Sequence, residues 1–271
     1  MLENQPDSPV YLLVAGYKIK ITFGSADFRF FRKKFITEFT SLYSGFITKN
    51  NNSNTSYEII FTEKPIIKTL RNKKKEQFIV YFEQLNNKII RTFYHISIFQ
   101  FQLILKYIIL KLLKNSGFVL HASASIINNK AFIFTGPKNI GKSTTVRLLN
   151  SKFKAIADDS VIIKKEKESN NFFCYQTPFL EKEYWIKKST NKYLISKIFF
   201  LDCKYKSLIK MIKNKKTIIS LLINQTLLPD KERSKLQLKR VLEFTGYFDN
   251  FYYLNHYDNH ERLTKYLSKL V

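Results

Sequence analysis

The chain has 271 residues, of which 45% are hydrophobic, so it is long enough for one large domain or two small ones and too apolar for global disorder. It carries 46 Lys and Arg against 21 Asp and Glu, a formal net charge of +25 at pH 7. The basic runs are short and scattered, and no nucleic-acid-binding motif accompanies them. We therefore interpret the charge as a solvated, lysine-rich surface rather than as a surface for nucleic acid. The excess charge would still attract a nucleotide or an acidic peptide.

The cysteines and the apolar segments of the sequence indicate in which cellular compartment the protein is expected. Cys174 and Cys203 are isolated, which predicts neither a disulfide framework nor a metal cluster and fits a reducing cytosol. The first seven residues lack the basic and apolar regions of a signal peptide. The apolar segment 96–113 is interrupted by glutamines and lysines, which indicates a buried or amphipathic helix rather than a membrane span. We expect a cytoplasmic protein with no membrane span.

The first 95 residues show strand patterns. Apolar and polar residues alternate over 17–22, which predicts a strand within 10–23. Residues 56–61 and 77–82 predict two more strands, and a turn at Asn86-Asn87 leads to a fourth at 88–94. We find no catalytic constellation here. The sequence predicts a small β-rich N-terminal region, 1–95, of unknown role.

From residue 96 onward, strand and helix patterns mix. A helix is predicted at 96–115, with Gly117 as its C-cap, and a hairpin is predicted at Asn128-Asn129. The predicted strands cover 118–127, 130–135, 155–164, 172–177, 197–201 and 251–254. The further predicted helices cover 144–152, 209–222, 231–244 and 260–270. This mixture predicts an α/β domain over 96–271.

A glycine-rich loop lies between a predicted strand and a predicted helix. Residues 136–143, GPKNIGKS, fit the pattern GxxxxGK[ST] in a chain with only seven glycines. Successive backbone N–H groups and the start of the following helix attract phosphate oxygens. Lys142 would neutralise the β- and γ-phosphates, and the Ser143 hydroxyl would ligate Mg²⁺. The sequence therefore predicts that this loop binds ATP and Mg²⁺.

The predicted nucleotide-binding positions follow the loop into the helix. They are Gly136, Pro137, Lys138, Asn139, Ile140, Gly141, Lys142, Ser143 and Thr144. Glycine at 136 and 141 allows backbone angles and a close approach of phosphate that a side chain would block. A chance match on a strand-to-helix turn is the alternative, and the strand and helix that flank the motif argue against it.

Two adjacent aspartates, Asp158 and Asp159, interrupt an apolar run soon after that helix. Buried carboxylates are costly unless they meet a cation or another partner, and Mg²⁺ beside a phosphate loop is such a partner. One aspartate could hold the metal, and the other could act as general base toward an acceptor. The alternative is a turn at the edge of a strand with solvated acids.

The order of these motifs resembles a known family. LHASA at 120–124, a hairpin, the glycine-rich loop, a helix and ADD at 157–159 resemble the catalytic domain of HPr kinase/phosphorylase, and more closely the shorter HPr-kinase-like proteins. That family shares its fold with phosphoenolpyruvate carboxykinase, binds ATP through a P-loop and phosphorylates a hydroxyl, often a serine. The resemblance is firm over about 117–163 and does not cover the N-terminal region. It implies an α/β (α+β) fold with a mixed sheet.

The resemblance also implies roles for single residues. Asp158 matches the base and Asp159 the metal partner, an order that could be exchanged, and Ser143 is the other metal ligand. His121 matches a histidine near the active site, so the catalytic candidates are Asp158, Lys142 and His121. The glycine-, proline- and arginine-bearing stretch of true HPr kinases after the acidic pair is missing here. HPr as the acceptor is therefore not implied.

Three functions are compatible with these motifs. The first is an ATP- and Mg²⁺-dependent kinase acting on a hydroxyl of a peptide, a protein or a small molecule. The second is a nucleotide-binding regulator or ATPase without an acceptor, and the third is a basic nucleic-acid-binding module. The aspartate pair favours the first, and the third rests on charge alone. The resemblance also allows a homo-oligomer. We interpret Trp185, the only tryptophan, as a packing or lid residue.

Overall fold

The computed structural model describes residues 8–24, 29–49, 54–70, 76–166, 170–202, 209–227, 231–255 and 260–269. The chain divides into two compact units, Met1–Leu112 and Leu113–Val271. This division follows the long apolar helix, whereas the border proposed from the sequence precedes it. The N-terminal seven residues and Cys203 lie outside the described residues.

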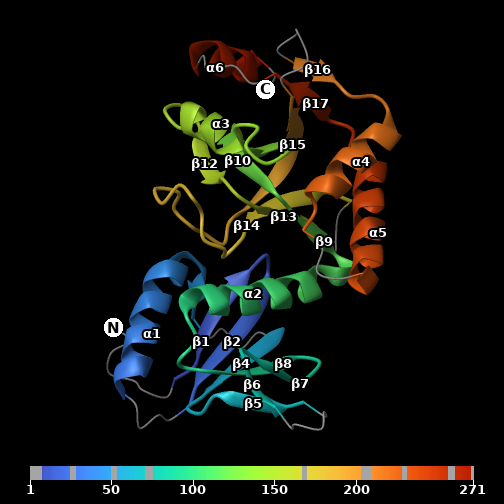
Figure 1. Ribbon diagram of the computed structural model, residues 1–271. Coiled ribbons are helices and arrows are strands. Elements are labelled where there is room, and N and C mark those ends of the chain that lie inside the picture. Colours follow the sequence, from blue (N-terminus) through green and yellow to red (C-terminus); the bar gives the residue numbers. More distant parts are fainter. Residues whose placement is uncertain are drawn as a thin grey trace. The chain divides into compact units, whose positions relative to one another are not determined.

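The N-terminal unit contains a six-stranded sheet in the order β3-β1-β2-β4-β8-β7, and a separate two-stranded sheet (Figure 1). The strands are β1 (Val10–Val14), β2 (Tyr17–Phe23), β3 (Ile47–Thr48), β4 (Tyr57–Thr62), β5 (Ile66–Thr69), β6 (Gln77–Val80), β7 (Glu83–Asn86) and β8 (Ile89–Phe93). The helices are α1 (Arg29–Tyr43), the short η1 (Ser44–Phe46) and α2 (Ile98–Leu112). The β-rich region predicted from the sequence therefore also contains a 15-residue helix, α1, that the sequence reasoning missed.

Aromatic packing explains where α1 and α2 lie. The rings of Phe35 and Phe39 on α1 pack against Phe101 of α2, with ring centroids 5.6 and 5.5 Å apart. Phe61 of β4 contacts Phe35 and Phe101 from the sheet side, so both helices cover the same sheet face. Because these large rings are buried, each contributes about 1.5–3 kcal/mol to stability. This packing also explains why α2 belongs to the N-terminal unit.

The C-terminal unit is an α/β domain, as the sequence predicts, with a nine-stranded mixed sheet. Its main path is β12-β10-β11-β15-β14-β13-β9, and β17 pairs with β15 and β16. The strands are β9 (Gly117–Leu120), β10 (Ala122–Ile127), β11 (Lys130–Thr135), β12 (Lys154–Ala157), β13 (Val161–Lys165), β14 (Phe172–Gln176), β15 (Lys192–Leu201), β16 (Ile209–Met211) and β17 (Phe251–Leu254). The helices are η2 (Leu113–Asn115), α3 (Lys142–Leu149), α4 (Lys215–Gln225), α5 (Lys231–Tyr247) and α6 (His260–Lys269).

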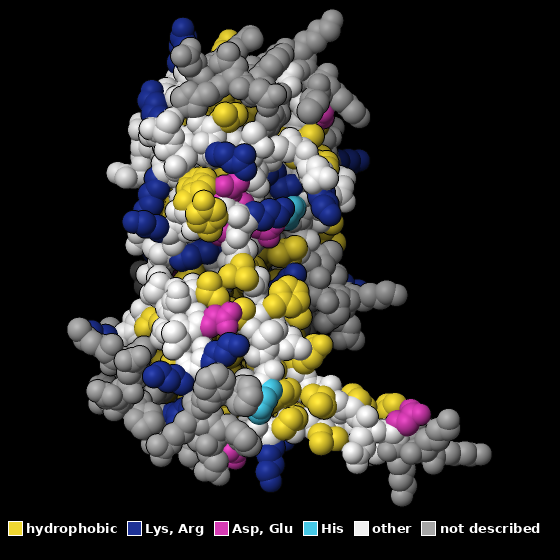
Figure 2. Space-filling model, turned by 60° about the vertical axis from the view of Figure 1, so that its left-hand side comes forward, with side chains coloured by type: hydrophobic (Ala, Val, Ile, Leu, Met, Phe, Trp, Pro, Cys, Tyr) yellow, Lys and Arg dark blue, Asp and Glu magenta, His cyan; other side chains and the backbone are white. Residues whose placement is uncertain are grey.

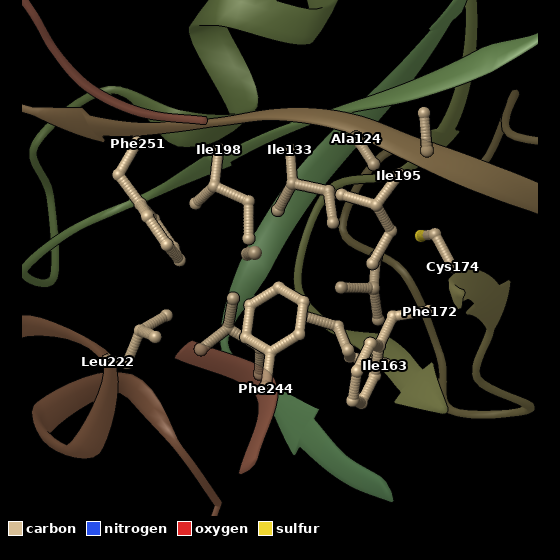
Figure 3. Close-up of a cluster of buried hydrophobic side chains, with 14 of the residues drawn as sticks. Ala124, Ile133, Ile163, Phe172, Cys174, Ile195, Ile198, Leu222, Phe244 and Phe251 are labelled. Carbon is tan, nitrogen blue, oxygen red and sulfur yellow. The ribbon is translucent and has the colours of Figure 1, made fainter. Parts of the chain in front are cut away.

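Helices cover both faces of this sheet (Figure 1). On one face, Leu222 of α4 and Phe244 of α5 join strand residues such as Ile163 in a large apolar cluster (Figure 3). On the other face, Leu149 of α3 and Leu267 of α6 pack in a second buried cluster. Because buried apolar area on both faces stabilises the sheet, its strand ends are held on a rigid scaffold.

Two local predictions have different outcomes. The Asn128-Asn129 hairpin between β10 and β11 is confirmed, since both residues have positive φ, 47° and 59°. Gly117 is not a C-cap, because it is the first residue of β9. A Cβ atom at Gly117 would lie 2.2 Å from the backbone oxygen of Ile163 on β13. Close approach of two strands therefore explains this glycine.

Among the predicted elements that differ from the observed ones are two strands that divide and one helix that begins with a strand. The run 118–127 is two strands that separate at His121, because β9 pairs with β13 while β10 pairs with β11 and β12. The run 155–164 likewise divides into β12 and β13 at residues 158–160. The predicted helix at 209–222 is wrong at its start, since β16 precedes α4. Asn214 caps α4 by accepting the N–H of Thr217 at 3.1 Å.

In the part of the chain that the structure describes, no helix combines the length and the apolar content needed to cross a bilayer. Cys174 lies buried on β14 as a free thiol, and burial raises its pKa. It is therefore a packing residue in the apolar cluster shown in Figure 3.

Candidate functional site

The glycine loop, residues 136–143, connects β11 to α3 through a backbone that favours glycine. Gly136 has φ 147°, Asn139 has φ 64° and Gly141, the N-cap of α3, has φ 102°. A Cβ atom at Gly136 would lie 3.2 Å from both the Leu201 backbone oxygen and a methyl carbon of Ile140. The two glycines therefore permit a tight loop at the start of the helix. Pro137 and Lys138 at its outer part are exposed.

Lys142 is folded back onto the glycine loop. Its side chain is 6% exposed, and its Nζ donates to the backbone oxygens of Gly136 and Pro137, both at 2.8 Å. Burial, followed by the charge of Lys182, lowers the pKa of Lys142. The first helical turn of α3 also presents N–H groups that have no partner within the helix. The helix N–H groups and the Lys142 ammonium group could therefore bind the same anion. The anion would replace the loop carbonyls as the partner of Lys142.

Hydrogen bonds hold the start of α3 beside the aspartate pair. The Ser143 hydroxyl donates to the backbone oxygen of Asp158 at 3.4 Å. From the neighbouring β10, the buried Ser123 hydroxyl donates to the backbone oxygen of Lys142 at 2.9 Å. The structure therefore brings the glycine loop and the aspartates together, as the order of motifs suggests. Thr144 lies in the same first turn and is partly exposed.

The two aspartates have opposite surroundings. Asp158 is 1% exposed, and its two carboxylate oxygens accept the backbone N–H groups of Lys182 and Glu183, each at 3.1 Å. The Asp159 side chain is 36% exposed, and its Oδ1 lies 3.8 Å from His121 Nδ1 and 3.9 Å from Lys182 Nζ. Asp158 therefore organises a neighbouring loop, while Asp159 is open to a ligand.

Glu181 holds the aspartate pair from the other side. Its Oε2 accepts the backbone N–H of Asp158 at 2.9 Å and that of Asp159 at 3.1 Å, and its Oε1 pairs with Lys188. Burial, which leaves only 4% of the side chain exposed, and then the contact with Asp158 together raise the pKa of Glu181 to about 7. The Glu181 side chain thus binds the backbone of Asp158 and Asp159, while the Asp158 side chain binds the backbone of Lys182 and Glu183. These crossed hydrogen bonds fix the path of both segments.

His121 lies at the break between β9 and β10. Its backbone N–H donates to Gln225 at 2.7 Å, and its backbone oxygen accepts the Thr135 hydroxyl at 2.9 Å. Burial and then the charge of Lys142 lower the pKa of His121, while Asp159 opposes them. The imidazole is therefore neutral at pH 7 and points a nitrogen toward Asp159.

The sequence reasoning missed the loop that follows β14. Glu181, Lys182, Glu183 and Lys188 all contact the aspartates or one another. The alternating charges of Glu181-Lys182-Glu183 are the only signal in the sequence, and they carry no recognisable motif. Trp185 packs on the apolar cluster under α3 and α6 and donates its Nε1 to Glu183 at 2.7 Å, which confirms its packing role.

The donor set can be compared with the needs of Mg²⁺. Among the described residues, no group of three or more His, Cys, Asp or Glu side chains is arranged to hold a metal ion. Mg²⁺ usually keeps several waters and takes one or two protein oxygens together with phosphate oxygens. The Ser143 hydroxyl at the start of α3 fits that pattern as a protein oxygen beside phosphate oxygens and water. In the space-filling view, acidic, basic and histidine side chains gather beside hydrophobic ones on one surface (Figure 2).

The sequence and the structure were compared with known proteins. No family model matches the sequence, and no curated protein matches it. Among solved structures, the chain is similar to the HPr(Ser) kinase/phosphatase from Coxiella burnetii, with 19% identity and a TM-score of 0.28. The match covers 46% of this chain and 93% of that chain. It is a weak likeness over less than half of the chain.

Proposed function

We propose that the C-terminal unit is an ATP- and Mg²⁺-dependent kinase that transfers the γ-phosphoryl group to a hydroxyl of a peptide, a protein or a small molecule. One observation carries the proposal. A GxxxxGKS loop at a helix start lies beside an acidic pair, with the Ser143 hydroxyl 3.4 Å from the backbone oxygen of Asp158. The order of motifs, which resembles the HPr-kinase-like proteins, supports the same reaction class.

Phosphate binding would use groups that are already in place. The backbone N–H groups of the glycine loop and the start of α3 would bind the phosphate oxygens of ATP. Lys142 would exchange its bonds to the loop carbonyls for bonds to phosphate. Because its ammonium group is buried, its attraction for an anion is stronger than in water. Ser143 would ligate Mg²⁺, which neutralises phosphate charge when bound.

We propose that Asp159, rather than Asp158, is the base, and that Asp158 has a structural role. Both carboxylate oxygens of Asp158 accept backbone N–H groups, and its side chain is 1% exposed, so it cannot readily reach an acceptor. Asp159 is partly exposed and faces His121 and Lys182. The metal would then be held by Ser143, phosphate oxygens and water. His121, neutral at pH 7, would orient the Asp159 carboxylate.

In the proposed transfer step, ADP is the leaving group and Asp159 accepts the proton. A bond forms between the acceptor oxygen and the γ-phosphorus, and the bond from that phosphorus to the bridging oxygen breaks. ADP leaves with the electron pair, and the acceptor proton passes to the Asp159 carboxylate. Lys142 stabilises the negative charge on the transferred group.

A transfer assay tests the proposal. The purified full chain is incubated with γ-labelled ATP, Mg²⁺ and a serine-peptide library, and label on peptide is measured against label released as phosphate. We expect label on peptide that depends on Mg²⁺ and falls by about 10²- to 10⁴-fold in Asp159→Asn. Phosphate release without transfer to any hydroxyl compound would favour an ATPase or regulator. Failure to bind ATP would overturn the kinase altogether.

A further inference from the structure

Lys182 places a second cation at the candidate site. It lies on the loop between β14 and β15, and its backbone N–H donates to Asp158 Oδ1 at 3.1 Å. Its side chain is 68% exposed, and its Nζ lies 3.9 Å from Asp159 Oδ1. Unlike Lys142, it has no place in the GxxxxGK[ST] motif. Nothing in the sequence pattern assigned it a role.

The backbone of Lys182 is fixed although its side chain is exposed. On its N-terminal side, Glu181 accepts the N–H groups of Asp158 and Asp159. On its C-terminal side, Glu183 donates its N–H to Asp158 and pairs with Arg147 of α3. The loop is therefore tied both to the aspartates and to the phosphate-binding helix. Because the backbone is already fixed, binding a ligand through this side chain orders no loop and restricts only the side-chain torsions.

The charges around Asp159 are unbalanced. The ammonium groups of Lys142 and Lys182 both act on this carboxylate, and Lys182 also lowers the pKa of Lys142 and of His121. Like charges that share one carboxylate repel each other, and an anion bound between them removes that repulsion. A phosphoryl group in transfer carries more negative charge than the Asp159 carboxylate, so it attracts the two ammonium groups more strongly. The site is therefore arranged for a second cation on that group.

We propose that Lys182 is a catalytic residue that leaves Asp159 and binds an oxygen of the phosphoryl group during transfer. The inference rests on the proposed kinase function. Release from Lys182 would also free Asp159 to take the acceptor proton. Cations supplied to the transferring group in this way act chiefly on the transition state, so they change turnover more than nucleotide affinity.

Three variants test this role. Lys182→Ala removes the cation, and Lys182→Arg restores a charge with different geometry. Lys187→Ala is the matched control, since Lys187 is an exposed lysine on the same loop. Because the Lys182 side chain is exposed and its backbone N–H remains, both Lys182 variants should fold.

Affinity for a transition-state mimic is the decisive measurement. Calorimetry compares ADP alone with ADP plus aluminium fluoride, in the presence of Mg²⁺. We expect Lys182→Ala to bind ADP within about threefold of the parent, and to lose about 10²-fold or more in affinity for the mimic and in turnover. Lys182→Arg should recover part of both losses. Lys187→Ala should match the parent.

The outcomes separate this inference from the proposed function. A parent protein that binds neither ADP nor the mimic overturns both. A parent that turns over ATP while Lys182→Ala matches Lys187→Ala overturns only the role of Lys182. Equal losses for ADP and the mimic would make Lys182 a ground-state binder and would also overturn it.

Discussion

The two units use their charged residues in different ways. In the N-terminal sheet, charges pair between directly opposed residues: Lys20 with Glu58 at 2.9 Å, and Arg91 with Glu83 at 2.6 Å. In the C-terminal unit, charges gather where strands break, at His121 and at residues 158–160. Regular strands space side chains evenly, so opposite charges meet across neighbouring strands. At a break, the backbone N–H groups leave the strand ladder and bond to other segments, such as those of Asp158 and Asp159 to Glu181, so several side chains converge at the candidate site.

The largest expected effect is on ATP affinity, and it compares Lys142 of the glycine loop with Lys20 of the N-terminal sheet. Lys142→Ala removes the ammonium group that would meet phosphate, so ATP affinity measured by calorimetry should fall by at least about 100-fold. Lys20→Ala also removes one positive charge and should leave ATP affinity unchanged. Equal affinities in both variants would contradict the assignment of the loop.

The second effect separates the two aspartates. Asp159→Asn should keep ATP affinity and lower turnover by about 10²- to 10⁴-fold, because the base is lost. Asp158→Asn should instead destabilise the fold by about 2 kcal/mol, because its carboxylate accepts two backbone N–H groups. Turnover assays and thermal unfolding of both variants distinguish these roles. An active Asp159→Asn variant would return the base to Asp158.

The third effect concerns the pH dependence of stability. The pKa of Glu181 is raised from 4.5 to about 7, so the folded state binds more protons than the unfolded state between these values. The free energy of unfolding should therefore fall as pH rises from about 4.5 to 7, by on the order of 3 kcal/mol from this group. Denaturant unfolding at pH 5 and pH 8 measures the difference.

Matched variants isolate the contribution of Glu181. Glu181→Gln keeps an oxygen for the N–H groups and cannot ionise, so it should remove this part of the pH dependence. Glu83→Gln in the N-terminal sheet is the comparison, since Arg91 lowers the pKa of the partly exposed Glu83. A Glu181→Gln variant that keeps the full pH dependence would show that other groups cause it.

The smallest effect is expected from the surface pair Lys20–Glu58. Both side chains are partly exposed, so solvent screens their attraction. Lys20→Ala should change the free energy of unfolding by about 0.5 kcal/mol, measured by denaturant titration. A loss as large as that expected for Asp158→Asn would show that the N-terminal pairs are more than surface contacts.

Local signals in the sequence predicted some elements and not others. Asn128-Asn129 forms the predicted hairpin because both residues tolerate positive φ. The helix α1 was missed because its residues gave no recognised start or stop signal, and its aromatic side chains find their partners on β4 and α2. The predicted helix at 209–222 fails at its start because β16 forms by pairing with β17, a contact with a distant part of the chain.

Some residues of the candidate site could likewise be predicted from the sequence, and others could not. The glycine loop and the aspartate pair are motifs of neighbouring residues, so they could be proposed from spacing alone. The roles of Glu181 and Lys182 depend on hydrogen bonds between segments more than 20 residues apart in the sequence. The bond from the Lys182 N–H to Asp158, for example, joins residues 24 positions apart. The spacing of residues in the sequence does not predict such contacts.

By itself, the sequence determined the α/β class of the C-terminal unit and the position of the glycine loop, because periodicity and backbone freedom are local properties. Only the tertiary structure decided which aspartate is buried and which is open. That difference arises because the loop after β14 folds back and donates its N–H groups to Asp158, leaving Asp159 beside His121 and Lys182. The environment of a carboxylate is set by what packs around it, and those groups come from distant segments of the chain.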